Sequence, residues 1–172
     1  MENAEIRREI ACSFTGHRPE RLPGGYAAWD SPASPLRPWI RRAVEEAAAD
    51  GYRDFICGMA LGADTLAAEE VLGLRERLEG IRLIAAVPCP EQADRWRQPD
   101  RMRYRRLLRL ADWMYTASPV YTPYAMHLRN RWMVAITGSL TDFSASNLML
   151  VVAAGLGIAV PLVLAWFAFR WI

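Results

Sequence analysis

Residues 52–64 read YRDFICGMALGAD, and this stretch decides the predicted fold. Residues 52–57 predict a buried strand that ends in Phe-Ile-Cys and is followed directly by glycine. Beyond the glycines at 58 and 62, leucine or valine recurs at positions 66, 71, 74 and 78 up to Gly80, which predicts a helix. Asp64 stands where it could cap that helix. Strand, glycine-bearing turn and helix in this order predict an α/β protein with a parallel sheet.

The same unit recurs on both sides of this stretch. Residues 10–14 (IACSF) predict a first strand, residues 20–35 a loop, and residues 36–47 a helix that ends at Asp50-Gly51. Residues 81–87 (IRLIAAV), stopped by a Pro-Cys-Pro turn, predict a third strand. An arginine-rich helix at about 99–111, a strand at 113–117 and a helix at about 122–136 follow. Strands that alternate with helices predict a Rossmann-like parallel sheet with helices on both faces.

Composition narrows the class of protein. The 172 residues suffice for one domain, predicted at 1–136, and a net charge of +2 gives no argument for nucleic acid by itself. All 21 basic residues are arginine. Three unpaired cysteines and a polar N-terminus without a signal peptide predict a cytoplasmic domain, and only two histidines argue against a metal site.

Two turns carry the candidate ligand site. In open α/β sheets, ligands bind at the carboxyl ends of the strands, where both turns fall. The first could give a phosphate a close backbone approach together with hydroxyl and guanidinium donors, and the second opens a helix whose N–H groups favour an anion. Ordinary structural turns are the alternative, since no G-x-G-x-x-G fingerprint is present. The candidate residues are Thr15, Gly16, His17 and Arg18 in the first turn, and Gly58, Ala60, Gly62 and Asp64 in the second.

The arginine-rich stretch allows two interpretations. Seven arginines between positions 95 and 109, with Trp96 and Tyr104 among them, could follow a phosphate backbone. A solvated helix face in a protein that uses arginine in place of lysine is the preferred alternative.

The C-terminal end has a different composition. Residues 137–147 are predicted as a polar linker, and residues 148–170 as an apolar, transmembrane helix that would anchor the domain in the cell membrane. Glycine, proline and flanking tryptophan are tolerated or favoured in such helices. A buried helix that completes the domain is the alternative.

Three blocks of sequence resemble a bacterial branch of the SLOG superfamily, a domain of unknown function. They are CSFTGHRP at 12–19, FICGMALGAD at 55–64 and RNRWMV at 129–134. The resemblance runs from about residue 10 to 134 and includes Pro88, Cys89, Gln92 and Trp96. It implies a Rossmann-like fold that binds a nucleotide or a nucleotide-derived molecule as a non-catalytic sensor without a cofactor. Arg129 and Arg131 would then close over the anion.

Related families supply the alternatives. The cytokinin-activating LOG enzymes, which hydrolyse a nucleotide's N-glycosidic bond, suggest a hydrolase, although their Pro-Gly-Gly-x-Gly-Thr loop is absent here. The DNA-processing protein suggests single-stranded nucleic-acid binding. Members of the resembled branch continue with a strand, a Gly-Gly-Thr turn and a helix, which we do not expect in residues 135–172. The sheet is therefore predicted to be incomplete at its C-terminal end, and its exposed edge suggests a homodimer.

Overall fold

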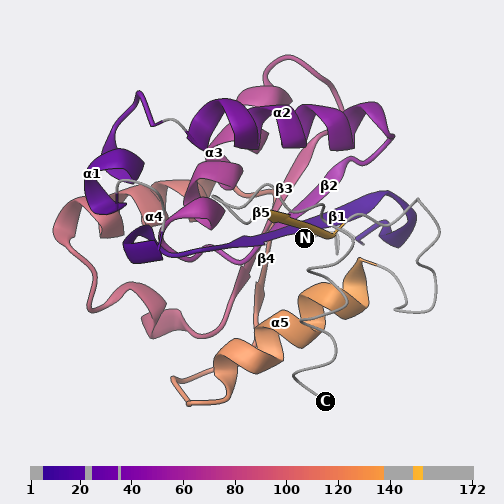
Figure 1. Ribbon diagram of the computed structural model, residues 1–172. Helices are drawn as coiled ribbons and strands as arrows, with labels where there is room; N and C mark the ends of the chain where they lie inside the picture. Colours follow the sequence, from indigo (N-terminus) through magenta and orange to yellow (C-terminus); the bar gives the residue numbers. More distant parts are fainter. Residues whose placement is uncertain (1–5, 22–24, 35, 138–148, 153–172) are drawn as a thin grey trace.

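The sheet consists of parallel strands, as predicted (Figure 1). The computed structural model describes residues 6–21, 25–34, 36–137 and 149–152. Within these residues the sheet has five strands in the order β4-β3-β2-β1-β5, and every neighbouring pair is parallel. The strands are β1 (Ala11–Gly16), β2 (Asp54–Cys57), β3 (Arg82–Val87), β4 (Trp113–Thr116) and β5 (Met149–Val152). The four strands predicted from the sequence are confirmed.

The helices follow the predicted pattern with two corrections. They are α1 (Gly25–Asp30), α2 (Leu36–Ala49), α3 (Ala63–Arg75), α4 (Gln98–Leu110) and α5 (Ala125–Ile136), with short 3-10 turns at Arg8–Ile10, Pro19–Arg21 and Pro90–Ala93. The predicted loop at 20–35 was wrong in part, because it contains α1 and most of a 3-10 turn. Helix α3 ends before Leu78, where the N–H groups of Arg77 and Leu78 both turn back to the Leu74 carbonyl.

Alternate strand residues serve two cores, because successive side chains of a strand point to opposite faces. Phe55, Cys57 and Leu83 pack with α2, α3 and α4 in the larger core. Ile56 and Ile84 pack with Met133 of α5 in a smaller core on the other face. Figure 1 shows α2 and α3 on one side of the sheet and α5 on the other. The prediction of helices on both faces is therefore confirmed.

The C-terminal region differs from its prediction. Residues 149–152, expected at the start of a transmembrane helix, form β5, and Ser13 of β1 lies opposite Met149. A fifth strand thus covers the edge of β1, where we expected the sheet to be incomplete, because β-branched and leucine residues serve a buried strand as well as a helix. Residues 138–147 of the predicted linker, and residues 148 and 153–170 of the predicted helix, lie outside the described residues. Among the described helices, none is both long and apolar enough to span a membrane.

Ion pairs connect the three helices that cover the larger core to one another. Arg37 of α2 contacts Glu69 and Glu70 of α3 at 2.5 and 3.0 Å. Arg103 of α4 reaches the same Glu69 at 2.5 Å with its Nε. One carboxylate of α3 therefore pairs with arginines of both α2 and α4.

Candidate functional site

The two predicted turns are packed directly against each other at the carboxyl ends of β1 and β2. The N–H of Ala63, the first residue of α3, donates to the His17 carbonyl oxygen at 3.1 Å. Gly62 has a φ of +98°, a region that favours glycine. A Cβ at this position would overlap the His17 carbonyl oxygen and lie 3.0 Å from the Arg18 Cα. Gly62 is therefore required by the contact between the turns.

Asp64 joins the same two turns from the inside. Its side chain is buried, with 2% of the residue exposed. Oδ1 accepts a hydrogen bond from the Gly16 N–H at 3.1 Å, and Oδ2 accepts one from the Ala60 N–H at 3.3 Å. The predicted N-cap role was wrong, because Gly62 is the N-cap residue of α3 and Asp64 lies in its first turn. The carboxylate instead holds the backbone of both turns.

Arg129 reaches the site from α5, on the other face of the sheet. It is 4% exposed, and its Nη1 donates to the Gly58 carbonyl oxygen at 2.5 Å. Its Nε and Nη2 donate to the Asn130 Oδ1 at 3.0 and 2.8 Å. A Cβ on Gly58 would lie 2.7 Å from Asp64 Oδ2 and 2.9 Å from Arg129 Nη1. The carboxylate and the guanidinium therefore both border the space where Gly58 has no side chain.

Burial is the largest cause of the pKa shifts of both Asp64 and Arg129. Burial raises the pKa of Asp64 from 3.8 to about 6, against the opposing effects of the Arg129 charge and the two N–H donors. Burial lowers the pKa of Arg129, while the charge of Asp64 raises it. At neutral pH the two groups carry opposite charges and have little contact with water, and no direct hydrogen bond or ion pair joins them within the described residues.

The remaining predicted residues take different positions. Arg18 is exposed, and its charge still lowers the pKa of both Asp64 and Arg129, so it lies near them. His17 is partly exposed, and the Thr15 side chain is outside the described part. Arg131 is exposed on α5, and no hydrogen bond or ion pair joins it to the two turns within the described residues. The structure thus brings Arg129 to the turns and leaves Arg131 at the surface.

Three supporting residues were not predicted as part of the site. Thr65 Oγ1 donates to the Ala60 carbonyl oxygen at 2.8 Å, and Gln92 Nε2 donates to the Met59 carbonyl oxygen at 2.6 Å. Met59 itself has a φ of +56°, which is uncommon for a residue with a side chain. Gln92 follows β3, so the carboxyl end of a third strand helps to hold the second turn. Its position in the resembled stretch was the available signal.

The cysteines have no accessible thiol chemistry. Cys12, Cys57 and Cys89 are all free and buried. Burial raises the pKa of the Cys12 and Cys57 thiols above their ordinary value, which disfavours the nucleophilic thiolate. Within the described ranges, no group of three histidine, cysteine or acidic residues is placed to hold a metal.

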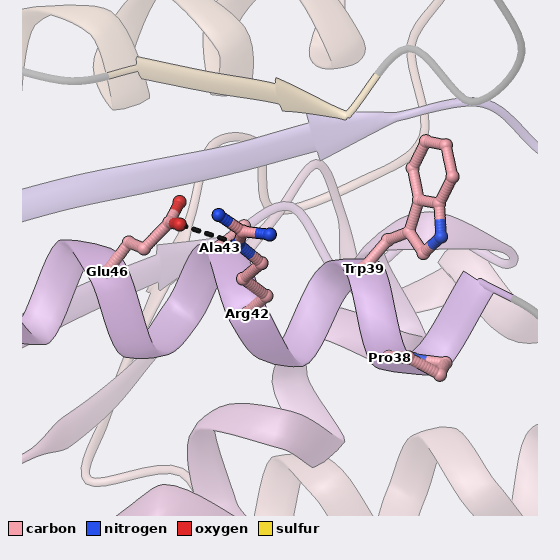
Figure 2. A pocket seen from close by; sticks show the side chains of 5 residues that line it. All are labelled: Pro38, Trp39, Arg42, Ala43 and Glu46. Carbon is pink, nitrogen blue, oxygen red and sulfur yellow. Dashed lines mark hydrogen bonds and ion pairs between the residues drawn. The ribbon is translucent and has the colours of Figure 1, made fainter.

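A hollow of about 490 Å³ lies elsewhere, on the outer surface of α2 (Figure 2). Arg42 and Glu46 pair across one turn of the helix there at 2.7 Å. Its described lining comes from α2 alone, so it is an open groove rather than part of the two turns. The lining residues are Pro38, Trp39, Arg42, Ala43 and Glu46.

Comparison with known families agrees with the sequence blocks at the two turns and on α5. A family model described as the YspA SLOG family matches residues 12–143. The chain belongs to this SLOG family. The match includes both turns and Arg129, so the buried cluster lies within the region that defines the SLOG domain.

Three curated relatives are UPF0398 proteins of bacilli. The chain is 26% identical to one from Bacillus pumilus over 131 residues, which cover 74% of this chain and 69% of the relative. It is 30% identical over 87 residues to one from Halalkalibacterium halodurans, covering 49% of this chain and 46% of the relative. It is 26% identical over 117 residues to the UPF0398 protein YpsA of Bacillus subtilis, covering 68% and 63%.

The raised pKa of Asp64 gives the SLOG domain a specific pH dependence. The pKa is about 6 in the folded state and 3.8 ordinarily, so the folded state binds the proton more tightly. The resulting stabilisation is complete below pH 3.8 and is lost as the pH rises through 6. The loss amounts to about 3 kcal/mol, since one pKa unit is worth ~1.4 kcal/mol. Urea unfolding between pH 4 and 7 should show wild type losing most of this amount, about 2.4 kcal/mol, relative to Asp64→Asn. Parallel pH profiles for the two proteins would contradict it.

Proposed function

We propose that this SLOG domain binds a phosphate-bearing, nucleotide-derived ligand over the carboxyl ends of β1 and β2. The proposal rests on one observation. The side chains of Asp64 and Arg129 form hydrogen bonds with the backbone of the two turns and so hold these turns in place. A site whose loops are fixed before the ligand arrives loses less conformational entropy on binding. The buried pair therefore acts as a positioning device, and the ligand contacts fall to the groups around it.

The phosphate contacts come from α3 and from Arg18. The first N–H groups of a helix have no intrahelical acceptor, and the helix dipole favours an anion there. Ala63 donates to His17 and Leu66 donates to Gly62. The N–H groups of Asp64 and Thr65 have no acceptor within the described part of the chain and could meet a phosphate. The exposed Arg18 guanidinium would supply the charge-assisted contact.

Binding without catalysis is the better-supported role. Both carboxylate oxygens of Asp64 accept backbone hydrogen bonds, and the residue is buried. A general acid or nucleophile needs to reach the reacting bond of the substrate. The proposed role is therefore that of a sensor, and hydrolysis of the N-glycosidic bond remains the alternative.

The membrane tether remains a prediction, and fewer residues are left to form the transmembrane helix than the sequence suggested. Residues 149–152 belong to the sheet, so a span would have to use the 17 uncharged residues from 153 to 169. That length is at the short end of the ~17–25 residues of a transmembrane helix.

Thermal unfolding of the full chain against ADP-ribose, NAD and nucleoside monophosphates tests the proposal. The full chain is required because a shorter one would lose β5. A ligand at 100 times its dissociation constant should stabilise the fold by about 2.7 kcal/mol. Arg18→Gln should remove most of this shift, since it removes a charged phosphate contact, while Arg21→Gln is the matched control three residues further on. Release of a free base from a monophosphate would favour the hydrolase.

Two results would contradict binding at the turns. One is a cooperative transition that no member of the panel moves. The other is a shift that Arg18→Gln leaves intact and Arg131→Gln removes, because the ligand would then lie on the outer surface of α5.

A further inference from the structure

The outer face of α4 concentrates positive charge. Asp100, Tyr104 and Leu107 point inward and are buried. At 3.6 residues per turn, three exposed arginines lie on the opposite side of the helix, and a fourth, Arg101, lies on its flank and is partly exposed. We refer to them as the arginine row: Arg101, Arg105, Arg106 and Arg109.

Pairing with acidic side chains separates this row from the other arginines of the region. Arg97 pairs with Asp100 at 2.6 Å, and Arg103 pairs with Glu69 at 2.5 Å. No side-chain hydrogen bond or ion pair joins the arginine row to any residue that the structure describes. The chain has 19 acidic residues for 21 basic ones, so charge is nearly balanced overall and unbalanced on this face. Such a field attracts an anionic partner.

The geometry of the row favours a linear partner. Arg101, Arg105 and Arg109 follow at four-residue intervals, which places successive Cα atoms about 6 Å apart along a line of about 12 Å. The guanidinium fork matches phosphate oxygens. We propose that the arginine row binds the phosphate backbone of a single-stranded nucleic acid. This proposal is independent of the ligand proposed at the two turns.

The surroundings of the row favour a strand over a flat anionic surface. Exposed carboxylates precede the helix at Glu91 and Asp94, and Asp112 follows it. An anionic bilayer would have to approach these carboxylates, whereas a single nucleic-acid strand can follow the arginine row between them. Met102, 64% exposed, and Leu110, 39% exposed, are the exposed large apolar residues of α4. Contacts to phosphates carry no sequence information, so binding to the row should be independent of sequence.

Fluorescence anisotropy with labelled oligothymidylate and the full chain tests the row. Four phosphate contacts predict that log K falls with log salt with a slope of about −3, because each contact on single strands contributes ~0.7. The triple variant Arg101→Gln/Arg105→Gln/Arg109→Gln should reduce the slope by about 2 and weaken binding at least tenfold at low salt. The charge-matched control is Arg8→Gln/Arg42→Gln/Arg77→Gln, which should stay within about twofold of wild type. Both variants change side chains that are exposed or, at Arg101, partly exposed, so thermal unfolding should confirm that each is folded.

Three outcomes would overturn the proposal. The first is no binding of oligothymidylate at low salt. The second is equal weakening in the triple variant and its control, which would assign binding to net charge. The third is equal or tighter binding of phosphatidylserine vesicles or polyglutamate, since the partner would then be a membrane or an acidic protein. If the wild-type protein binds oligothymidylate but not ADP-ribose, the result contradicts the proposed site at the turns and not the proposal for the arginine row.

Discussion

Replacement of Arg129 by methionine should lower the free energy of unfolding by about 3–5 kcal/mol, the range for a buried charge that loses its partner. The methionine fills part of the volume but cannot compensate the ionised Asp64 or donate to the Gly58 carbonyl oxygen. Urea unfolding at pH 7.5 measures the loss. Arg131→Met, two residues further along α5, changes an exposed arginine and should stay within about 0.5 kcal/mol of wild type.

The pH dependence of this loss distinguishes charge from packing. Without Arg129, the pKa of Asp64 should rise further above 6, so at pH 5 the carboxyl stays protonated and needs no counter-charge. The destabilisation should therefore be smaller at pH 5 than at pH 7.5. The double variant Arg129→Met/Asp64→Asn should also cost less than the sum of its parts. An equal loss at both pH values, with additive effects, would show that Arg129 contributes packing alone.

Gly62→Ala should produce the second large loss, about 2–5 kcal/mol. Roughly 1–2 kcal/mol arises from an L side chain at a positive φ, and about 1–3 kcal/mol from crowding in a packed region. The new methyl group would overlap the His17 carbonyl oxygen, which belongs to backbone and has little room to move. The two turns should separate, so ligand binding should weaken together with stability. Chemical unfolding and the ADP-ribose shift measure the two effects.

The same helix offers a matched control for this substitution. Gly73 lies within α3, and a Cβ there would meet nothing within 4 Å. Alanine is the better helix former, so Gly73→Ala should stabilise the protein by about 0.5–1 kcal/mol. Similar losses at positions 62 and 73 would contradict the packing of the two turns against each other.

Local sequence was sufficient to predict the strands and the turns that follow them. Glycine and proline directly after short apolar runs mark the ends of β1, β2 and β3 without any knowledge of the tertiary structure. The parallel sheet then follows from the alternation of strands and helices. Both candidate turns could be predicted for the same reason, since carboxyl ends of parallel strands share one edge of the sheet.

The roles of the buried charges could not be predicted in this way. Gly16 and Asp64 are 48 positions apart in the sequence, and Gly58 and Arg129 are 71 apart. No periodicity encodes such contacts. Asp64 at the start of a helix therefore suggested a cap, whereas both Asp64 and Arg129 hold backbone. The ligand contact predicted for Arg129 stays a prediction.

The C-terminal apolar run was ambiguous for a physical reason. An uninterrupted apolar segment suits a membrane helix, a core helix or a strand buried on both faces, and periodicity does not separate them. Residues 149–152 form a strand rather than part of a helix, because they pair with β1. The composition of this segment alone could not predict that β1 has a neighbour.

The chemical shifts of backbone amides during titration with ADP-ribose test the proposed site most directly. The measurement uses the ¹⁵N-labelled full chain. Binding at the two turns predicts that the amides of His17, Arg18, Asp64 and Thr65 shift and saturate together, while the amides of α4 stay in place. Shifts confined to the outer surface of α5 or to α4, or no shifts at millimolar ADP-ribose, would contradict a ligand site between the turns.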